Sequence, residues 1–149
     1  NSLSKTSNMA GWRVGFVAGK PEWISAITKV KSNMDSGMFL GIQQGAIAAM
    51  SLGRDWYGGL NEIYSKRRKL IWELAKKLGL EFEKDTAGMF VWAKLPQGKT
   101  SDELVDNLLY KKSIFVTPGH IFGTQGGGYV RFSLCVKEES IKEAIKRIS

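Results

Sequence analysis

Apolar residues recur every three or four positions along three stretches of the first half of this chain, and this spacing predicts three helices. The first begins near Pro21, since proline favours the first helical position, and the second spans residues 38–52. The third begins at Asp55 and ends at Gly79, because glycine readily adopts the backbone conformation that stops a helix. Between the first two, residues 32–37 are rich in Asn, Asp, Ser and Gly, which predicts a loop.

The second half of the chain alternates strand-like runs with amphipathic helical stretches, and one more strand-like run begins at Arg13. Residues 119–128 contain five glycines, which predicts a loop. This order of elements predicts an α/β fold, with an α+β part in which helices cover one face of a small mixed sheet. The predicted strands cover residues 13–18, 80–83, 89–95, 114–117 and 129–136, and the further predicted helices cover residues 101–111 and 140–148.

The composition is that of a globular chain with a core, since 43% of the residues are hydrophobic and no apolar run reaches the roughly 18 residues of a membrane span. The first residues lack the charged-then-apolar pattern of a secretory signal, so we expect a cytoplasmic protein without a membrane partner. The net charge of +8 is spread over several predicted helices, which favours solvated helix faces over a nucleic-acid surface. Cys135, the single cysteine, lies in an apolar run and is expected to be a buried small hydrophobic residue.

Reactive and anion-binding side chains gather at the amino end, around Lys5. Its amine can form a Schiff base with an aldehyde, and the hydroxyls of Ser2 and Ser4 can donate hydrogen bonds to phosphate oxygens. The guanidinium of Arg13 can bind two such oxygens at once. This combination suits a cofactor that carries both a carbonyl group and a phosphate. The alternative interpretation is a surface lysine, two turn serines and an arginine paired with an acidic side chain.

Four segments carry a resemblance to a known family. Residues 2–6 (SLSKT) with residues 8–16 (NMAGWRVGF) closely resemble the cofactor-lysine signature of class I/II aminotransferases, fold type I enzymes that use pyridoxal 5'-phosphate (PLP). Residues 88–92 (GMFVW), 117–123 (TPGHIFG) and 128–134 (GYVRFSL) follow in the order expected of that family's C-terminal half. The resemblance covers essentially the whole chain. It implies the C-terminal portion of such an enzyme, starting just before the cofactor lysine.

The resemblance assigns roles to five residues. Lys5 would be the catalytic residue, which binds PLP as a Schiff base and then moves a proton between substrate and cofactor. Ser2, Ser4 and Arg13 would bind the cofactor with it, and Arg131 would bind the substrate's α-carboxylate, with a salt bridge to a protein carboxylate as the alternative. The implied reaction, in a homodimer, transfers an amino group between an amino acid and a 2-oxo acid, of the aspartate, alanine or diaminopimelate type.

The same resemblance divides the chain into three parts. Residues 1–35 would end the PLP-binding large domain, residues 36–54 would form an interdomain helix, and residues 55–149 would form the C-terminal small domain. Phe122 resembles a residue of a loop that covers the substrate, although packing explains an aromatic side chain beside glycines equally well. His120 has no second ligand nearby in the sequence, so no metal site is expected.

Two alternative functions remain open. The same scaffold and lysine serve other PLP-dependent chemistry on amino acids, such as lyase or decarboxylase reactions, and Arg131 does not separate these from transamination. The second alternative is a non-catalytic domain that only associates. We expect the isolated 149-residue chain to be inactive, because the residues that contact the cofactor ring would lie upstream of Asn1.

Overall fold

The computed structural model describes residues 1–148 and consists of two compact units, Asn1–Tyr57 and a second unit that begins at Gly58. The division falls inside helix α4 (Arg54–Lys77), which begins in the first unit and continues in the second. Each unit has a hydrophobic cluster of its own. The functional limits at residues 1–35, 36–54 and 55–149 remain predictions.

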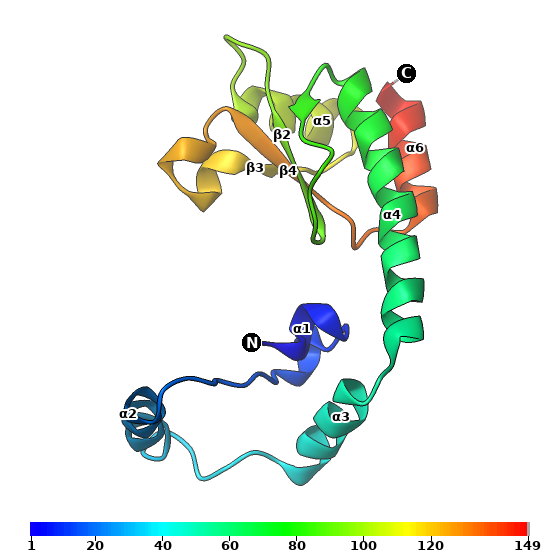
Figure 1. The fold of residues 1–149 in the computed structure, drawn as a ribbon. Coiled ribbons are helices and arrows are strands. Elements are labelled where there is room, and N and C mark those ends of the chain that lie inside the picture. The colour runs from blue at the N-terminus through cyan, green and yellow to red at the C-terminus, as the bar shows by residue number, and fades with distance from the viewer. Residues whose placement is uncertain (149) are drawn as a thin grey trace. The chain divides into compact units, whose positions relative to one another are not determined.

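The first unit contains short helices (Figure 1). The predictions of a helix that begins at Pro21, of a following loop and of a helix within residues 38–52 are confirmed. The elements are α1 (Leu3–Thr6), a 3₁₀ helix (Ala10–Trp12), α2 (Pro21–Lys31) and α3 (Leu40–Met50). Its small apolar cluster is formed by α1, the residues that follow it and α3, and α2 contributes no buried residue. The buried members of the cluster are Leu3, Met9, Val14, Ala46 and Ala49.

Residues 13–18 do not form the predicted strand. An isolated antiparallel bridge joins Ser2 and Gly15, and the Leu3 amide donates to the Val14 carbonyl at 3.1 Å. A strand needs a neighbour that continues beside it, whereas here the partner turns into α1 at Leu3. The apolar run therefore makes only one bridge with the residues at the amino end.

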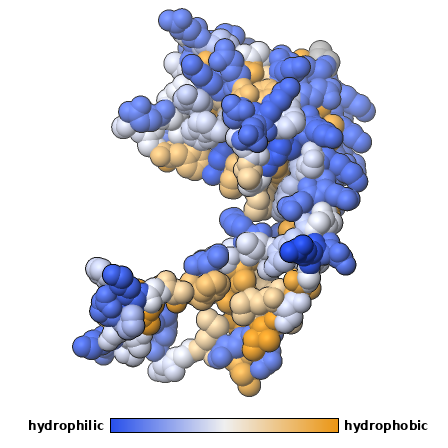
Figure 2. All heavy atoms as spheres, in the orientation of Figure 1, coloured by the Kyte–Doolittle hydropathy of each residue, from blue (hydrophilic) through white to orange (hydrophobic). Residues whose placement is uncertain are grey.

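Much of the apolar surface of α2 and α3 is exposed within the first unit. On α2, Trp23, Ile27 and Val30 share one helical face, and their side chains are 66%, 46% and 63% exposed. Ile47 and Met50 of α3 are also exposed. Figure 2 shows hydrophobic side chains gathered at the surface of this unit. Apolar surface of this extent is typical of a face that another part of a protein covers.

The second unit holds a four-stranded sheet with the strand order β1-β2-β4-β3. The α/β fold class is confirmed, but the three strand pairings are all antiparallel, so the sheet is not the mixed one that we expected. Short connections join β1 to β2 and β3 to β4. Strands joined by a short connection pair antiparallel, because a parallel pair needs a long crossover between its strands. The strands are β1 (Glu81–Phe82), β2 (Phe90–Lys94), β3 (Thr117–Pro118) and β4 (Tyr129–Ser133).

Helices α4, α5 (Ser101–Lys112) and α6 (Glu138–Ile148) contribute the other side of the core of this unit (Figure 1). Alternate strand residues point into that core, and Val91, Val130 and Phe132 are almost completely buried. The intervening residues of β2 and β4 lie on the opposite face and remain partly exposed. The helices supply Ile71, Leu74, Ala75, Val105, Leu108, Ile141 and Ile145 to the cluster.

Two helix ends in the second unit follow from their sequences. Gly79 has a φ of +71°, and the Leu80 amide donates to the Ala75 carbonyl at 2.9 Å, which closes α4 as the glycine predicted. At the start of α5, the Thr100 hydroxyl accepts from the Glu103 amide, and the Glu103 carboxylate accepts from the Thr100 amide, both at 3.3 Å. This reciprocal capping box satisfies two backbone donors that the helix itself cannot.

Thr100→Ala is expected to lower the free energy of unfolding by about 1 kcal/mol, because it removes the hydroxyl that caps α5. Urea denaturation of the 149-residue chain, followed by circular dichroism, measures this change. Thr100→Ser keeps a hydroxyl at the cap and is expected to unfold close to the parent. Equal stability of the alanine variant and the parent would show that the cap contributes nothing.

The predicted burial of Cys135 is wrong. β4 ends at Ser133, and Cys135 lies in the turn that follows, where its side chain is exposed. The apolar run continues past the last residue that pairs with β2, so hydrophobicity alone did not mark the end of the strand.

The connection from α5 to β4 also differs in detail from the prediction. β3 begins at Thr117, and within the predicted strand 114–117 only this residue pairs with β4. The glycine-rich loop contains two short 3₁₀ helices, Gly119–Phe122 and Thr124–Gly126. Gly119 and Gly126 are in close contact, and a Cβ on either would meet the backbone of the other, so the two glycines allow this compact turn.

Helix α4 is 24 residues long and carries many charged side chains, which keeps it at the protein surface along much of its length. Throughout the described residues, no helix combines the length and the apolar character that a membrane crossing requires.

Candidate functional site

Ser2 and Ser4 come together at the start of α1. Ser2 is the N-cap, with an extended backbone, and its hydroxyl accepts from the Ser4 amide at 3.1 Å. The two hydroxyl oxygens lie 3.0 Å apart, and the Ser2 hydroxyl is also 3.3 Å from the Val14 carbonyl. The short helix thus places two hydroxyl groups side by side, as an oxyanion-binding pair requires.

Lys5 is the third residue of α1, one position after Ser4. Its side chain is exposed, and it forms no ion pair with an acidic residue of the described chain. In the first unit the ion pair that does form joins Lys31 and Asp35 on the α2 side. The Lys5 amine is therefore available to a ligand.

Arg13 follows the 3₁₀ helix and adopts the left-handed backbone conformation, with a φ of +55°. Its guanidinium donates to the Ala10 carbonyl at 2.9 Å, which ties the side chain to the turn that precedes it. Trp12 lies against Gly45 of α3, where a Cβ would collide with the indole ring. The glycine therefore lets the 3₁₀ helix, and with it Arg13, approach α3 closely.

The Ser2–Gly15 bridge brings the backbone at Ser2 beside the backbone at Gly15. Ser2, Ser4 and Lys5 lie on the first of these two stretches of chain, and Arg13 lies on the second. We call these four residues the amino-terminal cluster. It offers two hydroxyls, an amine and a guanidinium, and no carboxylate of the described chain is paired with either cation. Such donors suit a phosphate and a carbonyl group, so the residues present fit the cofactor implied by the sequence.

Arg131 lies in the middle of β4, in the second unit, opposite Trp92 of β2. The alternative that it forms a salt bridge within the protein finds no support, since no described carboxylate pairs with it. Its guanidinium carbon instead lies 4.1 Å from the ring centroids of both Phe90 and Phe122. Sequence reasoning singled out Phe122 but missed Phe90. Phe90 lies diagonal to Arg131 across the β2–β4 pair. This contact can be expected only once it is known which residues of the two strands lie opposite each other.

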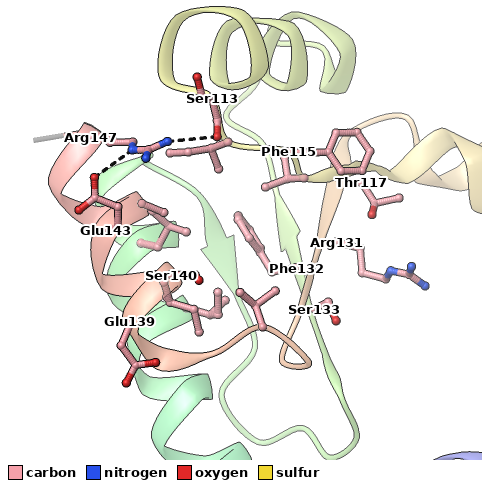
Figure 3. Close-up of a pocket in the computed structure, with 17 residues that line it drawn as sticks. Ser113, Phe115, Thr117, Arg131, Phe132, Ser133, Glu139, Ser140, Glu143 and Arg147 are labelled. Atoms are coloured by element: carbon pink, nitrogen blue, oxygen red, sulfur yellow. Dashed lines mark hydrogen bonds and ion pairs between the residues drawn. The ribbon is translucent and has the colours of Figure 1, made fainter.

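A pocket of about 720 Å³ lies in the second unit between α6 and the β3–β4 edge of the sheet. Figure 3 shows Phe132 directed toward α6 and Arg131 directed away from it. Across the pocket, Arg147 pairs with Glu143 at 3.1 Å and donates to the Ser113 carbonyl at 3.4 Å. Of the predicted site residues, only Arg131 lines this pocket.

His120 and Tyr64, also in the second unit, make contacts of their own. His120 Nδ1 lies 3.3 Å from a carboxylate oxygen of Asp102 and 3.4 Å from the Ser101 hydroxyl. Within the described residues, no three His, Cys, Asp or Glu side chains are placed to bind a metal ion. On α4, burial raises the pKa of Tyr64 above its ordinary value, the nearby Cys135 raises it further, and Arg67 opposes both. These groups are not part of the predicted site.

Comparisons with known proteins agree with the sequence motifs. The family model described as aminotransferase class I and II matches residues 1–148. LL-diaminopimelate aminotransferases from Maridesulfovibrio salexigens and Halothermothrix orenii are 42% and 44% identical over 149 and 148 residues, which is 100% and 99% of this chain. The chain spans 38% of the length of either relative.

Solved structures show the same likeness. Apo-BacF from Bacillus subtilis is 40% identical, with a TM-score of 0.89 over 99% of this chain and 38% of that protein. An aromatic aminotransferase from Pyrococcus horikoshii is 32% identical, with a TM-score of 0.90 over 99% of this chain and 40% of that protein. The match of the family model to almost every residue decides the classification. The chain belongs to the class I and II aminotransferase family.

Proposed function

We propose that the protein to which this chain belongs is a PLP-dependent aminotransferase that transfers an amino group between an amino acid and a 2-oxo acid. The observation that carries this proposal is the amino-terminal cluster. It combines the Ser2–Ser4 hydroxyl pair with Lys5, the next residue of α1, whose side chain is exposed and forms no ion pair with a described carboxylate, in a chain that the family model covers from residue 1 to residue 148. A carbonyl-binding amine beside phosphate-binding hydroxyls is the combination that such a cofactor needs.

The residues of the cluster divide between two roles in this proposal. Ser2, Ser4 and Arg13 bind the cofactor phosphate through hydroxyl and guanidinium donors. Lys5 binds the carbonyl carbon and, once released by the substrate, moves a proton at the substrate's α-carbon. The PLP ring, when bound, supplies the electron sink for this chemistry.

The substrate that we propose is an amino acid of the diaminopimelate, aspartate or alanine type. Several relatives are named LL-diaminopimelate aminotransferase, which supports the first of these. Arg131 binds the α-carboxylate that all such substrates share, because a guanidinium forms two parallel hydrogen bonds with a carboxylate. The location that we propose is the cytoplasm.

A labelling experiment on the full-length protein tests the cofactor assignment. After incubation with PLP and reduction with borohydride, mass spectrometry of a digest should find the pyridoxyl adduct on Lys5. An adduct on other lysines alone would refute the assignment. A parallel screen of LL-diaminopimelate, L-aspartate, L-alanine and L-phenylalanine with 2-oxoglutarate should detect glutamate. Release of ammonia or carbon dioxide without glutamate would instead favour a lyase or a decarboxylase.

The isolated 149-residue chain is expected to self-associate, most simply as a two-fold dimer, and not to transaminate. The exposed apolar side chains of α2 and α3 favour association in water, and homodimerisation of the full-length protein is part of the same proposal. Light scattering over a range of micromolar concentrations measures the mass. A constant mass of 16.6 kDa would refute the association, and turnover by the isolated chain with added PLP would refute the inactivity.

A further inference from the structure

Two aromatic rings of the second unit contact the guanidinium of Arg131, and we call Phe90 and Phe122 the aromatic clamp. Both ring centroids lie 4.1 Å from the guanidinium carbon. Phe90 pairs with Ser133 in the sheet, which puts it diagonal to Arg131 on the face away from the core. Phe122 ends the 3₁₀ helix that follows β3. Two elements distant in the sequence therefore meet at one side chain.

The clamp is itself supported by the sheet. Phe122 packs edge-on against Trp92, with the ring centroids 5.8 Å apart and the planes at 67°. Trp92 in turn stacks on Tyr129 across the β2–β4 pair, at 5.4 Å and 19°. Aromatic pairs in these geometries attract each other beyond the gain from burial. Phe122 is thus held at the surface of the sheet by Trp92, although it belongs to a connection between strands.

The two rings define the position of the Arg131 guanidinium and leave its N–H groups available to a ligand. Within the described residues the guanidinium has no carboxylate partner and donates no hydrogen bond, so the two rings provide its contacts. A cation over an aromatic face is attracted by the negative charge density of the ring. A ring accepts the flat side of the guanidinium and leaves the N–H groups at its edge free. An arginine held in this way is ready for a planar oxyanion such as a carboxylate.

We propose that Phe90 and Phe122 are positioning residues, which hold the guanidinium of Arg131 so that its N–H groups face the carboxylate of the substrate. This inference rests on the proposed function for the identity of the ligand. It adds to that function the two side chains that orient Arg131 before the ligand arrives. Binding then requires less loss of side-chain freedom, which is the advantage of a preorganised site.

Kinetics of the full-length protein test the clamp with LL-diaminopimelate and with L-aspartate as substrates. Phe90→Leu and Phe122→Leu should each raise KM about five- to thirtyfold, the range that one cation–π contact supports, with little change in kcat. Phe90→Tyr and Phe122→Tyr keep the ring and should behave like the parent. Tyr110→Leu, on a side chain 80% exposed on α5, is the matched control and should change neither constant.

The amide of the same amino acid separates positioning from general damage, because an amide lacks the charge that Arg131 binds. The leucine variants should lose affinity for the carboxylate form and much less for the amide. Equal losses for the two ligands, or an unchanged KM in both leucine variants, would overturn the proposal.

A second measurement does not depend on activity. In protein labelled with ¹⁵N-arginine, the side-chain signal that disappears in Arg131→Lys belongs to Arg131, and ring currents should displace its protons from the usual position. Phe90→Leu and Phe122→Leu should return the signal toward that position, and an undisplaced signal in the parent would refute the clamp. If Lys5 is not labelled by PLP but the displaced signal is present, the proposed function fails while the clamp stands.

Discussion

Lys5→Ala is expected to abolish transamination by the full-length protein. In the proposed function the amine both binds the cofactor's carbonyl carbon and moves the proton, and loss of the acid–base role alone costs about 10²- to 10⁴-fold in rate. PLP should still bind weakly, because Ser2, Ser4 and Arg13 keep their hydroxyl and guanidinium donors. Turnover with 2-oxoglutarate measures the first effect, and PLP retained after dialysis measures the second.

Lys29→Ala is the matched control for this experiment. Lys29 lies on α2, is exposed, and has no role in the amino-terminal cluster, so its loss should leave turnover and cofactor retention unchanged. Near-native turnover by Lys5→Ala would contradict the assignment of Lys5 as the catalytic residue. Complete loss of PLP binding would show instead that the hydroxyls and Arg13 do not bind the phosphate.

Arg131→Lys is expected to weaken substrate capture by about 1.5–3 kcal/mol, the scale of a hydrogen bond to a charged group, which corresponds to roughly 10- to 150-fold in KM. Lysine keeps the charge but loses the two-pronged geometry that matches a carboxylate. Borohydride labelling of Lys5 should not change, because Arg131 has no role in cofactor binding in this proposal. The measurement is KM for LL-diaminopimelate beside the labelled fraction of Lys5.

Arg54→Lys, at the exposed start of α4, makes the same chemical change away from both proposed binding groups and should behave like the parent. Reduced labelling of Lys5 with unchanged KM in Arg131→Lys would assign Arg131 to the cofactor site or to the fold. The pair of measurements therefore separates substrate binding from cofactor binding.

Helices were the part of the fold most accurately predicted from the sequence. Pro21 begins α2 and Gly79 follows the end of α4, because these signals act within a few residues. The amino-terminal cluster was proposed for a similar reason. Ser2, Ser4 and Lys5 are neighbours in the chain, so their types and spacing already indicate their chemistry.

Strand positions and the surroundings of Arg131 required the tertiary structure. A strand exists only where another segment pairs with it, so the apolar run 13–18 became a single bridge, and β4 ended before Cys135. The register between β2 and β4 placed Phe90 diagonal to Arg131, and the chain after β3 brought Phe122 to the same guanidinium. The sequence determined the local helices and indicated the type of chemistry that we propose. Contacts between distant segments decided where the strands form and how the side chain of Arg131 is oriented. The reason is that no local sequence pattern encodes which distant segments come into contact.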